Sequence, residues 1–401
     1  MVDGIAMAQL AGKFDQGVDV ITVVGTRPQL VKASEISLAL EAIGVRELLV
    51  HTGQHYDHNM SAGFSEALGL RPPDLNLHIG GGPHGWQTGQ MLDRLEAIML
   101  AALPARPRVL VYGDCNSTLA AALAAAKLGL PVDHVEAGLR SFQRDMPEEI
   151  NRVLTDRLSA LLFCPTQAAV EHLAREGLTE GVHLTGDVMC DAVERQIQLA
   201  LFIDPLGRHL SGKGTDPDAV RADLGVSGEV ALPQAGAYRV ATIHRASNTD
   251  DPATLQRLLD CIAGDPERPT WLLLHPRTRA RIEAFGLTLP AQGLILAPPA
   301  GYRVTLALVR FAHQLLTDSG GLQKEALMLG TPCVTLRAET EWVETVQAGW
   351  NTLVGADPDL IKAAMDASPP QGPPPRLYGD GRAAHRIAAL IKGAVAAQED
   401  Q

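Results

Sequence analysis

Four charged side chains bracket one short polar loop in the first half of the chain. They are Glu136, Arg140, Glu148 and Arg152. A strand is expected to end before Gly138, and Pro147 with the two glutamates behind it predicts the start of a helix. In an open α/β sheet, ligands bind at the loops that follow the strands. Carboxyl groups there could move protons and guanidinium groups could hold an anion, although this stretch alone also fits a solvated helix face with an ion pair four residues apart.

The helix that Pro147 opens is predicted to be amphipathic. Its apolar residues, with the start of the strand that follows, form one stripe expected to face the core. They are Ile150, Val153, Leu154, Leu158, Leu161 and Leu162. Glu148, Arg152 and Asp156 fall on the opposite face.

Two further strand ends in the first half carry polar groups. The strand 18–24 ends in Gly25-Thr26-Arg27-Pro28, and Pro28 is expected to start a helix that reaches about Ile43. A glycine turn, a cation and a helix N-terminus are compatible with phosphate binding. Asp114 follows the strand 108–112 and precedes an alanine-rich helix. Its position fits both the N-cap of that helix and the acid of a site.

The second half repeats this pattern of polar strand ends. The strands 240–243, 271–274 and 314–317 end in His244-Arg245, His275-Pro276 and Asp318-Ser319-Gly320-Gly321. Ser319 and the glycines open a helix, so their N–H groups suit a diphosphate, and Glu325 further along suits a ribose diol. The alternative is a plain N-cap with a glycine turn.

Strands therefore alternate with helices in two sets, which predicts an α/β fold with two doubly wound Rossmann-like domains facing a central cleft. Residues 201–237, rich in Pro, Gly and Asp, are expected to be the boundary. Neither half has a GxGxxG fingerprint, which disfavours a dinucleotide oxidoreductase.

Composition limits the partners and the compartment. The chain has 401 residues and a net charge of −12, which argues against nucleic acid. It shows no apolar run of membrane-spanning length and no signal peptide, so a cytoplasmic protein without membrane contact is expected, its five scattered cysteines reduced. His51, His55 and His58 do not predict a metal site, because Gly53 breaks any helix that would align them.

Ten motifs together resemble one known family. They are GTRPQLVK, GQHYDHNMS, the GD of YGDCNSTLA, HVEAGLRS, MPEEINR, TGDVM, TIHR, LTDSGGLQKEA, ETEWVE and AGWN. In this order they resemble the non-hydrolysing UDP-N-acetylglucosamine 2-epimerases from about Val18 onward. HTGQHYDHNMS, HGxQTGxML and ETEWVETVQAGWN resemble more closely the branch that acts on UDP-2,3-diacetamido-2,3-dideoxyglucuronate, in surface-polysaccharide pathways.

The resemblance implies a GT-B fold. Residues 18–190 with a C-terminal helix at 380–401 would form the domain on the sugar side, and residues 191–379 the UDP-binding domain. It also implies a homodimer that binds a UDP-sugar and UDP, without a metal or cofactor.

The resemblance further implies a role for each matching residue. Asp114, Glu136 and Glu148 would be acid/base carboxyls, with His244 assisting. The residues implied to bind the substrate or UDP are Arg27, Lys32, Arg140, Asn151, Arg152, Arg245, His275, Ser319, Gly320, Gly321 and Glu325. Three carboxyls in one closed site cannot all stay charged, so at least one is expected to have a raised pKa.

The chemistry of such a substrate restricts the mechanism. The hydrogen on C2 is not acidic, because no carbonyl lies next to it, and no nicotinamide site is visible. Breaking the C1–O bond first lets UDP leave and a base take the C2 proton, which gives a glycal. The alternatives are a hydrolysing epimerase that releases free sugar and UDP, a glycosyltransferase, which the carboxyl set disfavours, and a non-catalytic UDP-sugar sensor.

A few positions depart from the family pattern. Gln29 stands in place of the Glu of the commoner GTRPE, Ser247 in place of the Glu of HRxEN, and Ala338 where an acidic residue is frequent. Gln54 fits the second-site activation of some bacterial members but Asp57 does not, so no such activation is expected.

Overall fold

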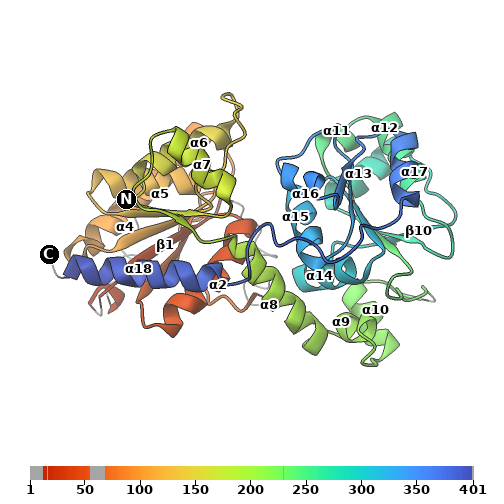
Figure 1. The fold of residues 1–401 in the computed structure, drawn as a ribbon, viewed down its shortest axis with the longest axis horizontal. Helices are drawn as coiled ribbons and strands as arrows, with labels where there is room; N and C mark the ends of the chain where they lie inside the picture. The colour runs from red at the N-terminus through yellow and green to blue at the C-terminus, as the bar shows by residue number, and fades with distance from the viewer. Residues whose placement is uncertain (1–11, 16, 55–67, 229, 400–401) are drawn as a thin grey trace. The chain divides into compact units, whose positions relative to one another are not determined.

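The computed structural model describes residues 12–15, 17–54, 68–228 and 230–399. The chain folds into two units, Met1–Ala192 with Tyr378–Gln401 and Val193–Leu377. Each unit has its own parallel sheet and its own hydrophobic core. The predicted α/β fold of two doubly wound units is therefore confirmed (Figure 1).

The described part of the first unit has a seven-stranded sheet in the order β3-β2-β1-β4-β5-β6-β7. The strands are β1 (Val20–Val24), β2 (Glu47–His51), β3 (Leu75–Asn76), β4 (Arg108–Tyr112), β5 (Val132–Val135), β6 (Leu161–Cys164) and β7 (Val182–Leu184). Apolar β1 and β4 are buried throughout, as strands covered on both faces are. The strand order reverses between β1 and β4, so this edge is the topological switch point.

Helices flank this sheet in the usual alternation. They are α2 (Arg27–Ala42), α4 (His84–Ala102), α5 (Asn116–Lys127), α6 (Pro147–Leu158), α7 (Gln167–Arg175) and α18 (Ala383–Glu399). The last helix, α18, packs against α2, and the amine of Lys392 donates to the carbonyl of Ile43 at 2.7 Å (Figure 1).

The second unit has a six-stranded sheet among its described residues, in the order β10-β9-β8-β11-β12-β13. The strands are β8 (Arg239–Thr242), β9 (Thr270–Leu273), β10 (Leu294–Ala297), β11 (Gln314–Thr317), β12 (Cys333–Thr335) and β13 (Asn351–Leu353). The helices are α9 (Pro205–Leu210), α10 (Pro217–Leu224), α11 (Ala246–Thr249), α12 (Pro252–Ile262), α13 (Pro276–Phe285), α14 (Tyr302–Phe311), α15 (Gly320–Leu329), α16 (Val343–Gln347) and α17 (Pro358–Asp366). Here the order reverses between β8 and β11.

The prediction that residues 201–237 form the boundary is wrong. The units meet in the sequence at Ala192 and Val193, inside the helix α8 (Val188–Ile203). The segment instead contains α9 and α10, whose buried Leu206 and Val220 belong to the core of the second unit. Short helices with proline starts and glycine ends give little periodicity, which explains the error. The short edge strands β3 and β13 were not predicted either.

Candidate active site

The turn after β1 is held by a buried amide side chain. Oε1 of Gln29 accepts the N–H groups of Gly25 at 2.7 Å and Thr26 at 3.2 Å, and its Nε2 donates to the carbonyl of Tyr112 on β4 at 2.6 Å. An ionised glutamate could accept the first two bonds but not donate the third. Gln29, which stands where the family more commonly has Glu, therefore ties the ends of β1 and β4 together at the switch point.

The same turn has no room for a side chain at Gly25. A Cβ there would collide with the hydroxyls of Ser117 and Thr52, which are both buried. The tight turn lets α2 start directly after it, with Arg27 exposed at its first position. Lys32, one turn later, is buried on the sheet side of the helix.

Glu136 follows β5 in a strained backbone conformation. Its φ is +73°, in the left-handed region that a residue with a side chain rarely adopts. Its carboxylate forms an ion pair with the amine of Lys32, and both side chains are largely buried. Strain that persists because the surrounding structure imposes it is a mark of functional positions.

Asp114 lies on the neighbouring strand end and is no helix cap, since Cys115 takes the N-cap position of α5. An oxygen of its carboxylate is 2.5 Å from the guanidinium of Arg152, and Asn151 donates to its backbone carbonyl at 2.8 Å. Burial, and to a smaller extent the Glu136 carboxylate, raise the pKa of Asp114, against the opposing effect of Arg152. This is the direction expected for a carboxyl set that shares one site.

The first turn of α6 presents two glutamates with different surroundings. Glu149 is buried: it accepts the N–H groups of Ser141 and Phe142 at 2.8 and 2.9 Å and binds Arg152 at 2.9 Å. These bonds lower the pKa of Glu149 although burial opposes them. Glu148 is half-buried, and no described residue forms a hydrogen bond or ion pair with it. Its carboxylate is available for a ligand.

The predicted orientation of α6 is wrong. Ile150 and Leu154 of the supposed core stripe are 47% and 45% exposed, and Asp156, expected on the opposite face, is fully buried. The helix buries a polar face instead, made of Glu149, Asn151, Thr155 and Asp156. Three of these side chains have hydrogen-bond partners in the loops after β4 and β5, so their burial costs little. Hydropathy alone does not show such partners.

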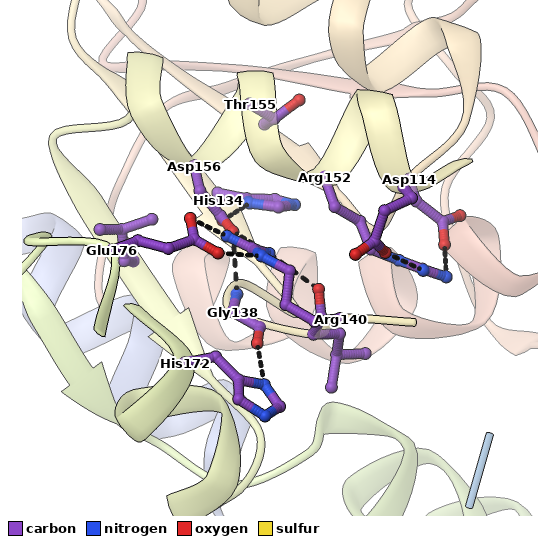
Figure 2. A network of polar contacts seen from close by, with 12 residues as sticks. Asp114, His134, Gly138, Arg140, Arg152, Thr155, Asp156, His172 and Glu176 are labelled. Atoms are coloured by element: carbon purple, nitrogen blue, oxygen red, sulfur yellow. Dashed lines mark hydrogen bonds and ion pairs between the residues drawn. The ribbon is translucent and has the colours of Figure 1, made fainter. Parts of the chain in front are cut away.

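Arg140 is a second correction. Its side chain is 1% exposed and lies between the carboxylates of Asp156 and Glu176, each at 2.7 Å (Figure 2). Both carboxylates raise the pKa of Arg140 despite its burial. The guanidinium is thus committed inside the unit, and we reassign Arg140 from substrate binding to structure. Glu176, at the C-cap of α7, and Asp156 on α6 gave no sequence signal for this pairing.

The second unit has a buried carboxylate at its switch point. Asp318 is fully buried and accepts the backbone N–H groups of His244 and Arg245 at 2.9 Å and the side-chain amide of Asn248 at 3.0 Å. Nδ1 of His244 lies 3.0 Å from its other oxygen. Although burial opposes ionisation, the bonds from His244 lower the pKa of Asp318. The carboxylate fixes the ring of His244, which leaves Nε2 for another partner.

His275 stands beside His244, with ring centroids 5.2 Å apart. Its Nδ1 accepts the N–H of Arg277 at 3.2 Å and so caps α13. Burial and the neighbouring His244 lower the pKa of His275. A neutral His275 agrees with its accepting role. Arg245 is exposed, and its Nε donates to the carbonyl of Asp318 at 3.1 Å.

Ser319 stands at the N-cap of α15, but its hydroxyl makes no capping bond. Gly320 and Gly321 follow in the first turn, and Gly321 is exposed. Glu325 is buried one turn later, where the phenol of Tyr302 donates to it at 3.1 Å. The backbone N–H groups and the hydroxyl at this helix start are suited to an anion.

The remaining predictions concern the periphery of these sites. Ser247 and Ala338 are exposed. His51 is buried, accepts the N–H of Gly53 at 2.9 Å and has its pKa lowered to about 4 by burial. His55, Asp57, His58 and most of the motif GQHYDHNMS lie outside the described residues. Gln54 is described, and its side-chain oxygen accepts the hydroxyl of Ser117 at 2.7 Å.

The candidate site residues fall into two groups, one on each unit. The first-unit group consists of Arg27, Lys32, Asp114, Glu136, Glu148, Asn151 and Arg152, and the second-unit group of His244, Arg245, His275, Ser319, Gly320, Gly321 and Glu325. Sequence reasoning gave no role to four buried residues that hold these groups: His134, Glu149, Asp156 and Asp318. Three of them had a signal, since His134, Glu149 and Asp318 each lie within a family motif, whereas Asp156 does not.

These features are typical of one class: α/β enzymes of the GT-B type, here with paired carboxyls and cations at one switch point and a helix start suited to an anion at the other. No described helix is long and apolar enough to span a bilayer.

Comparison with known proteins identifies the family. The profile of the UDP-N-acetylglucosamine 2-epimerases matches residues 38–392, and the chain belongs to this family. It is 44% identical over 380 residues to the UDP-2,3-diacetamido-2,3-dideoxy-D-glucuronate 2-epimerase of Pseudomonas aeruginosa, covering 93% of this chain and 99% of that one. The crystal structure of Methanocaldococcus jannaschii UDP-GlcNAc 2-epimerase in complex with UDP-GlcNAc and UDP is 36% identical and superposes with a TM-score of 0.76, covering 94% and 100%. The Neisseria meningitidis UDP-GlcNAc 2-epimerase bound to UDP-GlcNAc is 27% identical, with a TM-score of 0.75 and the same coverage.

Proposed function

We propose that this enzyme inverts C2 of a UDP-linked N-acetylated hexose by eliminating UDP and adding it back. The C1–O bond breaks first and UDP leaves with the bonding electrons. A carboxylate of the first-unit group then takes the C2 proton, and the electrons of the C–H bond form the C1–C2 double bond of a glycal. Protonation of C2 from the opposite face and attack of a UDP oxygen on C1 restore the covalent bond in the epimer.

The observation that carries this proposal is the pair of carboxylates at the switch point of the first unit. Asp114 and Glu136 end adjacent strands, each with a cation against it, and the pKa of Asp114 is raised. Two carboxyl groups at adjacent strand ends suit a reaction that removes a proton on one side and delivers one on the other. Glu148, which no described residue pairs with, is the third candidate.

The second-unit group is proposed to bind UDP. The N–H groups at the start of α15 and the hydroxyl of Ser319 would hold the diphosphate, and Glu325 would accept from the ribose hydroxyls. His244, oriented by Asp318, would donate through Nε2 to the departing phosphate oxygen. The identity of 44% to the Pseudomonas enzyme supports UDP-2,3-diacetamido-2,3-dideoxyglucuronate as the first substrate to test, and UDP-N-acetylglucosamine as the second.

The direct test is to incubate each UDP-sugar with the protein and follow the products by proton NMR. We expect the C2 epimer with UDP still attached at equilibrium. Free UDP that accumulates in proportion to turnover would instead identify a hydrolysing epimerase. Binding of both UDP-sugars without conversion of either would instead identify a non-catalytic UDP-sugar sensor.

Replacing Ser319 by alanine is expected to weaken UDP binding by about 1 kcal/mol, roughly fivefold in Kd, as for one neutral hydrogen bond. Isothermal titration calorimetry with UDP measures this. Ser227→Ala, at an exposed position of the second unit, is the matched control and should leave Kd unchanged. Equal affinities of the two variants would remove Ser319 from the proposed site.

A further inference from the structure

The side chain of His134 contacts the turn that carries Asp114, a carboxyl residue of the first-unit group. It belongs to β5, between β4 and β6, and its ring is fully buried. Nε2 lies 2.8 Å from the carbonyl of Gly113, the residue before Asp114, and Nδ1 lies 2.7 Å from Oδ1 of Asp156. Figure 2 shows the ring between α6 and the strand ends.

The partners of the ring determine its protonation. A backbone carbonyl can only accept, so Nε2 carries a hydrogen. The second oxygen of Asp156 already accepts from Arg140 at 2.7 Å and from the N–H of Gly138 at 3.2 Å. Two donors on one oxygen, one of them a guanidinium, favour an ionised carboxylate, so Nδ1 of His134 must donate as well. Both ring nitrogens then face acceptors, which is the geometry of an imidazolium.

Charge balance around the ring supports the same state. Arg140 and Glu176 complete the cluster, at 2.7 Å from each other. With His134 protonated, two cations face two carboxylates, whereas a neutral ring would leave Arg140 alone to balance the fully buried carboxylate of Asp156 and the partly exposed one of Glu176. Cys164 on β6 adds no charge, because burial raises the pKa of its thiol to about 12. Ring and carboxylate together thus tie the loops after β4 and β5 to α6.

The contact with Gly113 gives the imidazolium a consequence for the reaction. Gly113 has a φ of +61°, which turns the chain directly before Asp114. The carbonyl of Gly113 accepts from the His134 ring, and this contact holds the turn in place. Glu136 follows His134 by two residues on the same strand end. We propose that His134 is a permanently protonated positioning residue that fixes the Gly113–Asp114 turn for proton transfer at C2; the catalytic part of this inference rests on the proposed function.

The protonation state is tested without any activity. Full-length protein labelled with nitrogen-15 in its histidine rings is titrated by NMR, and the His134 signals are assigned by their absence in His134→Gln. We expect both ring nitrogens to remain protonated between about pH 6 and 9, where an ordinary imidazole loses its proton. A neutral tautomer within this range would overturn the proposal.

Two matched variants separate the two contacts of the ring. Gln places its amide near the position of Nε2 and can still donate to Gly113, whereas Asn places it near Nδ1 and reaches only Asp156. We expect His134→Asn to lower kcat about a hundredfold with KM nearly unchanged, the effect of a misplaced catalytic group, and His134→Gln to lose less. The backbone NMR signal of Asp114 should shift in His134→Asn and stay close to native in His134→Gln.

The control is His172→Gln, at a ring that contacts the carbonyl of Gly138 on the far side of the network and should retain full activity. Equal losses in the Asn and Gln variants, or a loss expressed in KM, would overturn the positioning role. If native protein has no epimerase activity, the proposed function fails, while the ring nitrogens and the Asp114 signal still decide the structural inference.

Discussion

Replacing Glu136 by glutamine is expected to lower kcat by at least about a hundredfold, the low end for a lost general acid or base. The substitution keeps the shape of the side chain and its hydrogen-bonding oxygen, but it removes the charge that pairs with Lys32 and the ability to take a proton. Affinity for UDP should remain near native, because the residues proposed to bind UDP belong to the second unit. Steady-state kinetics and calorimetry with UDP separate these effects.

Asp114→Asn and Glu148→Gln are expected to behave in the same way. Glu171→Gln is the control, since among the described residues Glu171 pairs only with Arg175, at the exposed surface of α7, where ion pairs contribute little. Near-native turnover in all three carboxyl variants would remove the proposed catalytic assignment. A loss in only one or two would identify which carboxyls transfer the proton.

Replacing Asp156 by asparagine is expected to destabilise the first unit by about 3–5 kcal/mol, the usual cost of removing one partner from a buried ion pair. The change leaves the charge of Arg140, and the one proposed for His134, buried against a neutral amide. Urea unfolding followed by circular dichroism measures the shift. Asp380→Asn is the control: its pair with Arg386 is exposed at the surface, so its transition should hardly move.

The same substitution carries a pH dependence whose sign follows from the lowered pKa of Asp156. Burial opposes ionisation, but His134 and Arg140 hold the pKa below its usual range. Stability from such a group is fully present above the unfolded value of about 3.9 and is lost as the pH falls through the folded value. The difference between native protein and Asp156→Asn should therefore shrink below about pH 4. A difference that is small at pH 7, or that grows on acidification, would contradict the ion-pair assignment.

The parts of the fold that hydropathy determines were predictable from the sequence. Strands such as Val20–Val24 and Arg108–Tyr112 are covered on both faces, so their apolar runs stand out, and the polar residues behind them mark the sheet edge. The strand ends of Asp114, Glu136, His244 and Ser319 were recognised in this way. The family motifs then supplied their proposed roles.

The errors concern residues whose environment depends on a specific partner. Helix α6 buries Asn151 and Asp156 and exposes Ile150 and Leu154, because hydrogen bonds to distant loops offset the cost of burying polar groups. Arg140 was assigned to substrate binding because nothing in the sequence indicates its ion pair with Glu176, 36 residues away. Periodicity describes which face is apolar, not which polar face finds partners.

Deuterium incorporation tests the central claim most directly. Native enzyme is incubated with the UDP-sugar it converts in heavy water, and the product is followed by proton NMR. If the C2 proton passes to a carboxyl group and C2 is then reprotonated from solvent, the product should carry deuterium at C2 and at no other carbon. UDP should remain attached in the product at equilibrium. Epimer formed with its original hydrogen still at C2 would contradict elimination and re-addition.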